Sequence, residues 1–250
     1  MRRHNNSIKC PKLTVEPRSR TQAAYIKAID ENDLVFGLGP AGTGKTFIAV
    51  AYAVEQMERN KNQHTKKNSP MGRLIITRPV VEAGESLGFL PGDLTEKIDP
   101  YMRPIFDSLN KTMGPERAEA ALNDFTIEIA PLAFMRGRTL EDCIVILDEA
   151  QNTTRMQMKM FLTRIGDNTK TIVTGDTSQI DLPGGTAESG LVQAASLFPG
   201  VVENVTSIEF DESEVVRHPM VKEIVRIYRE WGEYPRVTDE ENIDSIHPSE

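Results

Sequence analysis

A short glycine-rich string constrains the fold of this 250-residue chain more than any other part of its sequence. It follows the pattern Gly-x-x-x-x-Gly-Lys-Thr and consists of Gly39, Pro40, Ala41, Gly42, Thr43, Gly44, Lys45 and Thr46. The apolar residues 34–38 precede it, and residues 44–59 follow it with apolar side chains at helical spacing. A strand, a glycine-rich turn and a helix in this order predict a phosphate-binding loop, whose backbone N–H groups surround phosphate oxygens.

Two polar side chains of this loop have expected roles, and all eight residues are candidate nucleotide contacts. Lys45 should contact the β- and γ-phosphates of a bound nucleotide, and the Thr46 hydroxyl should bind Mg²⁺. The alternative is a glycine-rich turn without a ligand. Such a turn rarely matches the whole pattern between a buried strand and a helix.

Apolar strand-like segments alternate with helix-like segments along the rest of the chain. The expected strands are residues 34–38, 73–77, 125–130, 144–147, 171–174 and 207–210. The expected helices are residues 21–30, 44–59, 98–113, 156–165, 189–198 and 216–231, with breaks near the prolines at positions 100 and 104. The polar residues 60–72 predict a surface loop. This alternation predicts an α/β fold with a mostly parallel central sheet flanked by helices.

Composition argues against several other classes of protein. No run approaches the roughly 18 apolar residues of a membrane span, and the first residues have no apolar segment behind them, so no membrane partner and no secretory signal are expected. Cys10 and Cys143 lie far apart, which favours a reducing cytoplasm. The net charge of −8 argues against broad coating of nucleic acid but not against a local groove. We expect a flexible basic arm at residues 1–19, one domain at residues 20–233 and an acidic disordered tail at residues 234–250.

Two carboxylates stand where an expected buried strand ends. Asp148 and Glu149 follow the apolar residues 144–147, at the sheet edge where open α/β sheets bind ligands. Asp148 would hold Mg²⁺, and Glu149 would polarise the water that attacks the γ-phosphate. The alternative is an acidic helix N-cap. A kinase for small molecules must keep water out, so this pair favours a hydrolase.

The sequence lacks the motif that usually recognises guanine, and this indicates which nucleotide is expected to bind. Recognition of guanine usually needs Asn/Thr-Lys-x-Asp, and the nearest string, at residues 60–63, lacks the aspartate. ATP is therefore the expected ligand. The string Gly-Asp-x-x-Gln at residues 175–179 resembles the coupling motif of superfamily 1 helicases, in which Gln179 would sense the γ-phosphate. Gln22 stands where those helicases carry a glutamine that recognises adenine.

Further motifs resemble the PhoH-like family of phosphate-starvation-inducible ATPases. They are Ile-Thr-Arg-Pro-Val at residues 76–80, Gly-Phe-Leu-Pro-Gly-Asp at 88–93, Pro-Leu-Ala-Phe-Met-Arg-Gly-Arg-Thr-Leu at 131–140, Asp-Glu-Ala-Gln-Asn-Thr-Thr at 148–154 and Val-Val-Arg-His at 215–218. The resemblance implies a single RecA-like P-loop NTPase domain with ATPase activity linked to RNA metabolism. It also implies single-stranded RNA and an endoribonuclease of ribosome maturation as partners.

Two functions stay open at this point. The first is an ATPase that remodels or translocates RNA, and the second is a nucleotide-dependent switch that recruits a nuclease without unwinding. Stimulation of ATP turnover by single-stranded RNA separates the two.

One domain of this kind leaves an ATP site incomplete. Superfamily 1 helicases place a second domain around the nucleotide, and that domain supplies an arginine to the γ-phosphate. Here a neighbouring subunit would supply it in trans, which predicts a homo-oligomer in a closed ring. The family resemblance suggests a hexamer. Arg217 is the first candidate for this arginine, followed by Arg136 and Arg138, and the alternative for each is an ordinary surface arginine.

Two other features have more than one interpretation. Arg78 follows a predicted strand, where helicases place a nucleic-acid contact, and the alternative is a structural ion pair. The cluster of Met156, Met158, Met160 and Phe161 is expected to serve the core and an oligomer interface.

Overall fold

The computed structural model describes residues 16–62, 72–80, 94–215, 220–221, 223–224 and 226–227. Contacts divide the chain into two units, Met1–Val215 and Val216–Glu250. In the second unit, the described residues are helical, which agrees with the helix expected at 216–231 as far as it is described. The predicted arm, apart from residues 16–19, and the predicted tail lie outside the described residues, so their boundaries stay predictions.

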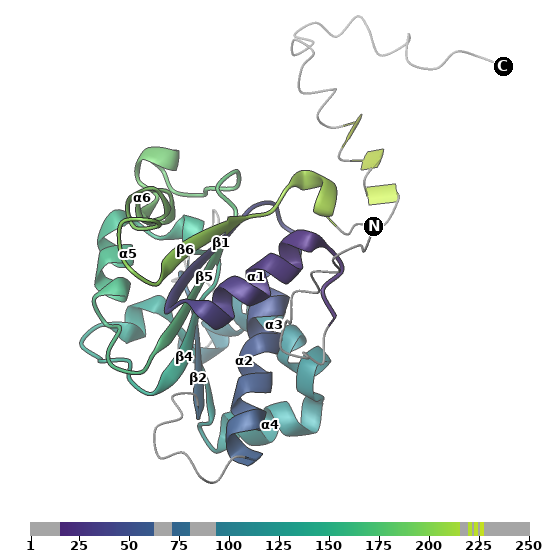
Figure 1. Ribbon diagram of the computed structural model, residues 1–250, viewed down its shortest axis with the longest axis vertical. Helices are drawn as coiled ribbons and strands as arrows, with labels where there is room; N and C mark the ends of the chain where they lie inside the picture. The colour runs from purple at the N-terminus through teal and green to yellow at the C-terminus, as the bar shows by residue number, and fades with distance from the viewer. Residues whose placement is uncertain are drawn as a thin grey trace, which may run out of the picture. The chain divides into compact units, whose positions relative to one another are not determined.

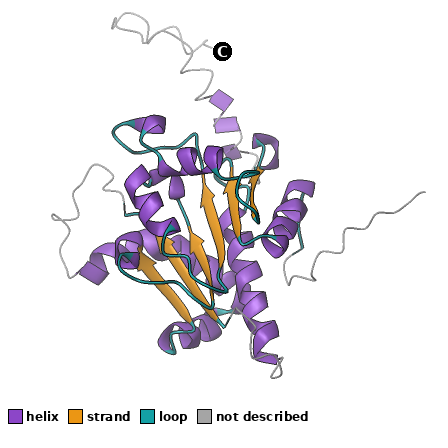
Figure 2. Ribbon diagram, turned by 60° about the vertical axis from the view of Figure 1, so that its left-hand side comes forward, coloured by secondary structure: helices purple, strands orange, loops and turns teal. Residues whose placement is uncertain are grey.

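The first unit is built on a six-stranded sheet in the order β3-β2-β4-β5-β1-β6. Figure 2 shows the strands of this sheet side by side, in orange, with helices around them. The strands are β1 (Leu34–Leu38), β2 (Arg73–Arg78), β3 (Ile127–Pro131), β4 (Cys143–Leu147), β5 (Lys170–Gly175) and β6 (Val205–Glu209). Every neighbouring pair is parallel. The carboxyl ends of β1, β5 and β4 therefore lie side by side along the carboxyl-terminal edge of the sheet, with β5 in the middle.

Helices cover both faces of this sheet (Figure 1). They are α1 (Arg20–Glu31), α2 (Lys45–Asn62), α3 (Leu94–Met113), α4 (Pro115–Asn123), α5 (Arg155–Leu162) and α6 (Gly190–Leu197). The first four pack on one face, where Val35 points, and α5 and α6 pack on the other face with Phe36. This alternation along β1 follows from the two-residue period of a strand. The predicted α/β fold, a parallel central sheet flanked by helices, is confirmed.

The largest local differences from the predictions concern the helices α2, α3 and α4; the bounds of several other elements differ by one to three residues. Helix α3 continues through Pro100 and Pro104, so the expected breaks are wrong. Its buried side chains Met102, Ile105 and Leu109 pack into the core, and this packing offsets the loss of backbone hydrogen bonds at the prolines. Helix α4 was not expected from the sequence, and α2 extends to Asn62, into the segment expected to be a loop.

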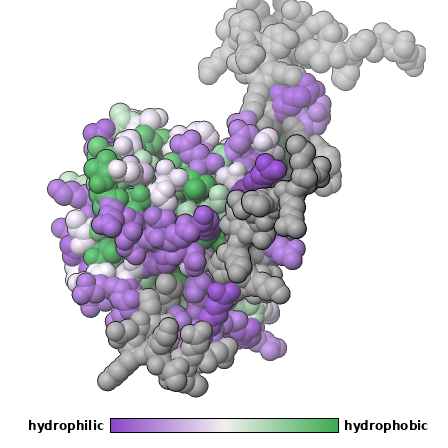
Figure 3. Space-filling view, viewed as in Figure 1, coloured by the Kyte–Doolittle hydropathy of each residue, from purple (hydrophilic) through white to green (hydrophobic). Residues whose placement is uncertain are grey.

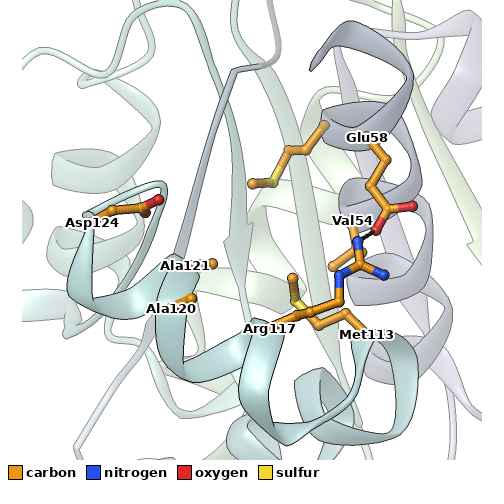
Figure 4. A pocket seen from close by; sticks show the side chains of 8 residues that line it. Val54, Glu58, Met113, Arg117, Ala120, Ala121 and Asp124 are labelled. Atoms are coloured by element: carbon orange, nitrogen blue, oxygen red, sulfur yellow. Dashed lines mark hydrogen bonds and ion pairs between the residues drawn. The ribbon is translucent and has the colours of Figure 1, made fainter. Parts of the chain in front are cut away.

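Two surface features lie away from the carboxyl ends of the strands. Leu197, at the end of α6, and Val201 and Val202, which follow it, have exposed apolar side chains. Figure 3 shows apolar residues on the surface in the region of α6. A pocket of about 190 Å³ opens between α2 and α4, with an ion pair between Glu58 and Arg117 at its wall (Figure 4). Within the described parts of the chain, no helix combines the length and apolar character needed to cross a bilayer.

Candidate nucleotide site

The predicted phosphate loop connects β1 to α2 and depends on glycine geometry. Gly39, Gly42 and Gly44 have φ values of 135°, 87° and 87°, a region that side-chain-bearing residues rarely occupy. A Cβ atom on Gly39 would lie 2.5 Å from the carbonyl oxygen of Phe210, which follows β6. The loop therefore requires glycine at this position for both its conformation and its packing.

Lys45 lies inside this loop and is 7% exposed. Its Nζ donates hydrogen bonds to the carbonyl oxygens of Gly39, at 2.6 Å, and Pro40, at 2.8 Å. Burial lowers the pKa of Lys45, while the nearby carboxylates of Asp176, Glu149 and Asp148 act in the opposite direction. A buried ammonium group thus faces the sheet edge on which the three carboxylates lie.

Asp148 joins the three segments of the site. Its Oδ1 accepts hydrogen bonds from the hydroxyls of Thr46, at 2.6 Å, and Thr174, at 2.7 Å. Its backbone N–H donates to the carbonyl oxygen of Thr77 at 2.9 Å. The side chain is almost fully buried. The structure therefore brings the two predicted metal ligands, Thr46 and Asp148, into direct contact, although more than one hundred positions separate them in sequence.

This pair of oxygens fits Mg²⁺. A hydroxyl and a carboxylate are hard ligands, and Mg²⁺ commonly combines one or two protein ligands with phosphate oxygens and water. No group of three or more His, Cys, Asp or Glu side chains suited to a metal occurs among the described residues. Thr46 and Asp148 would thus supply two oxygen ligands to such a cation.

Glu149 has an unusual backbone conformation, with φ 51° and ψ 38°. Its Oε1 lies 3.3 Å from Arg78 Nη2, and its Oε2 accepts a 2.5 Å hydrogen bond from Gln151 Nε2. Glu149 occupies the N-cap position of a short 3₁₀ helix, Ala150–Asn152, but its side chain makes no capping hydrogen bond. Strained backbone of this kind clusters at functional sites, and here it orients a carboxylate beside Asp148.

Gln151 and Asp176 connect Glu149 to the phosphate loop. Gln151 Oε1 accepts a hydrogen bond from the backbone N–H of Asp176 at 3.1 Å. Asp176 Oδ2 in turn accepts from the backbone N–H of Ala41 at 3.0 Å. No role was expected from the sequence for Gln151, Asp176 or Thr174. Gln151 and Asp176 lie within recognised motifs, but a motif does not reveal which atoms its side chains contact.

The two glutamines predicted to contact the nucleotide differ in their burial and in their hydrogen bonds. Gln22 is buried, and its Nε2 donates to the carbonyl oxygen of Thr43 at 2.9 Å while its Oε1 accepts from the backbone N–H of Arg18 at 2.7 Å. These bonds attach α1 to the phosphate loop, and recognition of adenine by Gln22 stays a prediction. Gln179 is exposed in the turn after β5, and its backbone N–H donates to Asp176 O.

The candidate arginines have different surroundings. Arg217 lies outside the described residues. Arg138 forms two hydrogen bonds to Glu128, and Arg136 is exposed. Arg78 donates to the carbonyl oxygen of Tyr101 at 2.8 Å in addition to pairing with Glu149. The structural ion pair considered for Arg78 is thus present, and a nucleic-acid contact stays a prediction.

The cluster of methionines is divided between core and surface. Met158 and Phe161 are buried in the core, whereas Met156 is 82% exposed and Met160 is partly buried. The core role expected for this cluster therefore holds for two of its members, and an oligomer interface stays a prediction.

The parallel sheet, the phosphate loop and the acidic end of β4 define the class of this protein as a P-loop NTPase by fold. Comparison with known proteins gives the family, because the PhoH-like protein family matches residues 14–229. The chain belongs to the PhoH-like family, which confirms the resemblance found in its motifs.

Curated relatives agree with this assignment. A PhoH-like protein of Bacillus subtilis is 54% identical over 215 residues, which are 86% of this chain and 64% of the relative. A PhoH-like protein of Mycobacterium tuberculosis is 51% identical over 220 residues, 88% of this chain and 59% of the relative. Protein PhoH of Escherichia coli is 44% identical over 213 residues, 84% of this chain and 57% of the relative. The chain thus spans less than two thirds of the length of these relatives.

Among solved structures, the crystal structure of Pif1 helicase from Candida albicans is similar with a TM-score of 0.40 at 12% identity. The match covers 89% of this chain and 46% of the helicase chain.

Proposed function

We propose that this protein binds ATP together with Mg²⁺ and hydrolyses it at the edge formed by β1, β5 and β4. The observation that carries the proposal is the 2.6 Å contact between the Thr46 hydroxyl and Asp148 Oδ1. It joins the phosphate loop to the acidic strand end, so one ligand can contact both. The next residue, Glu149, adds a second carboxylate, which interacts electrostatically with the Lys45 side chain.

Each residue has a defined part in the reaction. The loop N–H groups and Lys45 bind the phosphates, and Thr46 and Asp148 hold the cation. Mg²⁺, when bound, neutralises charge on the β- and γ-phosphate oxygens. Glu149 accepts the proton of a water molecule that attacks the γ-phosphorus in line, and the bond to the β–γ bridging oxygen breaks. The products are ADP and inorganic phosphate.

We further propose that hydrolysis is coupled to single-stranded RNA in the cytoplasm. The family resemblance supports this coupling, and the position of Arg78 is compatible with it, because its side chain remains 19% exposed beside Glu149. With a net charge of −8, binding would depend on a local basic groove.

A second candidate is a nucleotide-dependent switch that recruits an endoribonuclease. The hydrogen bond from Ala41 to Asp176 favours it, because it connects the phosphate loop to the exposed turn that contains Gln179. A change in the loop on nucleotide binding would reach the surface along this path. The partner nuclease is again implied by the family.

We also propose a homo-oligomeric ring, by family resemblance a hexamer, in which Arg217 of one subunit completes the ATP site of the next. The family resemblance supports this arrangement, because an arginine supplied in trans can stabilise charge on the γ-phosphate. The exposed apolar side chains after α6 support association between copies, because apolar patches often mark interfaces.

The test is ATP turnover by the full chain with and without an unstructured single-stranded RNA, beside a measurement of molecular mass in solution. We expect turnover that requires Mg²⁺, rises with the RNA and comes from an oligomer. Nucleotide-dependent binding of a nuclease without RNA stimulation would favour the switch instead. A folded protein with no turnover at saturating ATP and Mg²⁺ would refute the hydrolase.

A further inference from the structure

The side chain of Gln151 lies between the two halves of the site with both ends of its amide bonded. It is 2% exposed and follows β4 in the same 3₁₀ turn as Glu149. Its Nε2 donates to Glu149 Oε2 at 2.5 Å, and its Oε1 accepts from the backbone N–H of Asp176 at 3.1 Å. One buried amide therefore connects the proposed general base to the end of β5.

The orientation of this amide is fixed by its surroundings. A backbone N–H can only donate, so the oxygen of Gln151 must face Asp176 and the nitrogen must face Glu149. The backbone of Gln151 is held as well, since Ser189 Oγ donates to its carbonyl oxygen at 2.8 Å. A Cβ on Gly175 would lie 2.8 Å from Gln151 Oε1, so a glycine at the end of β5 gives the amide its space.

The Glu149 carboxylate needs the hydrogen bond from Gln151 because the Glu149 side chain is only partly buried. Its side chain is 38% exposed, and its other oxygen meets Arg78 at the longer distance of 3.3 Å. The short bond from Gln151 is thus a closer restraint on this carboxylate than the ion pair. Without it, the carboxylate gains rotational freedom relative to the phosphate loop, and catalysis depends strongly on such geometry.

The same amide also reaches the phosphate loop. Asp176, which donates to Gln151 through its backbone, accepts the N–H of Ala41 through its carboxylate at 3.0 Å. The path from Glu149 through Gln151 and Asp176 to Ala41 is therefore continuous. It fixes the position of the base relative to the loop that binds the phosphates.

We propose that Gln151 is a positioning residue that orients the Glu149 carboxylate for attack of water on the γ-phosphate. This inference rests on the proposed ATP hydrolysis. It does not make Gln151 a catalytic residue, since Gln151 acts only through Glu149. Loss of its donor should lower kcat by about 100-fold, as expected for a misplaced catalytic group, and leave ATP affinity within about threefold of wild type.

The first variant is Gln151→Glu, which keeps an acceptor for the Asp176 N–H but replaces the donor to Glu149 by an oxygen. Asn152→Asp is a matched control. Asn152 is also buried, its Oδ1 accepts from the Asp181 N–H at 2.8 Å, and its Nδ2 donates to Asp181 Oδ2 at 3.0 Å. The control therefore introduces the same change opposite the carboxylate of Asp181, and not opposite that of Glu149. We expect it to retain kcat within about threefold.

A double variant tests whether Gln151 acts through Glu149. When Gln151→Glu is combined with Glu149→Gln, the new amide at position 149 can donate to the new carboxylate at position 151. The contact is then restored although the base is absent. We expect the double variant to have the residual kcat of Glu149→Gln alone, and independent effects would multiply instead. If Gln151→Glu does not fold, Gln151→Met removes both bonds without adding charge and carries the same expectation.

The outcomes separate this inference from the proposed function. A low kcat for Gln151→Glu or Gln151→Met with normal ATP affinity, an active Asn152→Asp and a non-additive double variant support it. An active wild type with an equally active Gln151 variant, or losses that multiply in the double variant, overturns the inference alone. A wild type without turnover refutes the proposed function and the inference with it.

Discussion

Thr174 offers a sharp test of the polar network around Asp148, because a valine has nearly its shape. The Thr174 side chain is fully buried on β5, and its Oγ1 donates to Asp148 Oδ1 at 2.7 Å. Hydrogen bonds to charged groups contribute about 1.5–3 kcal/mol each. Thr174→Val removes this bond and places a methyl group against the carboxylate. We expect the free energy of unfolding to fall by roughly this amount.

Thr171 on the same strand provides the matched control. It is also fully buried, but its Oγ1 has no hydrogen-bond partner among the residues that the structure describes. Burial of such a hydroxyl costs about 1–3 kcal/mol, so Thr171→Val should stabilise the protein by about 1 kcal/mol or more. The same substitution thus has opposite signs at two positions on one strand, with a gap of roughly 3 kcal/mol between the variants.

The assay is urea unfolding of both variants and the wild type in one buffer, with thermal unfolding as a second measurement. For a domain of this size, 3 kcal/mol corresponds to roughly 6–12 °C in Tm. Thr174→Val should unfold first and Thr171→Val last. Equal stability of the two variants, or the reverse order, would refute the reasoning about Asp148.

Three further predictions concern the loop and the ring. Lys45→Ala should abolish binding of a fluorescent ATP analogue in a folded protein, whereas Lys27→Ala, at an exposed ion pair on α1, should bind it normally. Gly39→Ala should lower the free energy of unfolding by at least about 1–3 kcal/mol in urea, because its Cβ meets Phe210 O; wild-type stability would contradict the geometry. Arg217→Ala should bind ATP and lose on the order of 10³-fold in turnover. Mixing it with Lys45→Ala should restore activity, and mixed oligomers that stay inactive would exclude a trans role.

The sequence predicted those features that rest on local patterns. The bounds of β1 were correct because a short apolar run between an acidic residue and a glycine-rich turn is typical of a buried strand. The phosphate loop and the position of Asp148 at a strand end followed in the same way. Thr46 and Asp148 were expected to lie close together because both were predicted to bind Mg²⁺, and in the structure their side chains form a hydrogen bond.

Other features depend on tertiary contacts and could not be predicted. Prolines in α3 argue for breaks, but burial of Ile105 and Leu109 outweighs the local preference. The bonds of Gln151 and Thr174 are invisible in a sequence for a similar reason, because each connects the end of β4 with β5. Such partners become known only when the order of β4 and β5 in the sheet is known.

The most direct test of ATP hydrolysis at this site is a comparison of Glu149→Gln with the wild type at saturating ATP and Mg²⁺. The substitution keeps the shape of the side chain and removes the base, so ATP affinity should stay near that of the wild type. Release of phosphate should fall by about 10²–10⁴-fold. Wild-type phosphate release by a folded Glu149→Gln variant would contradict the account, because the base would then lie elsewhere.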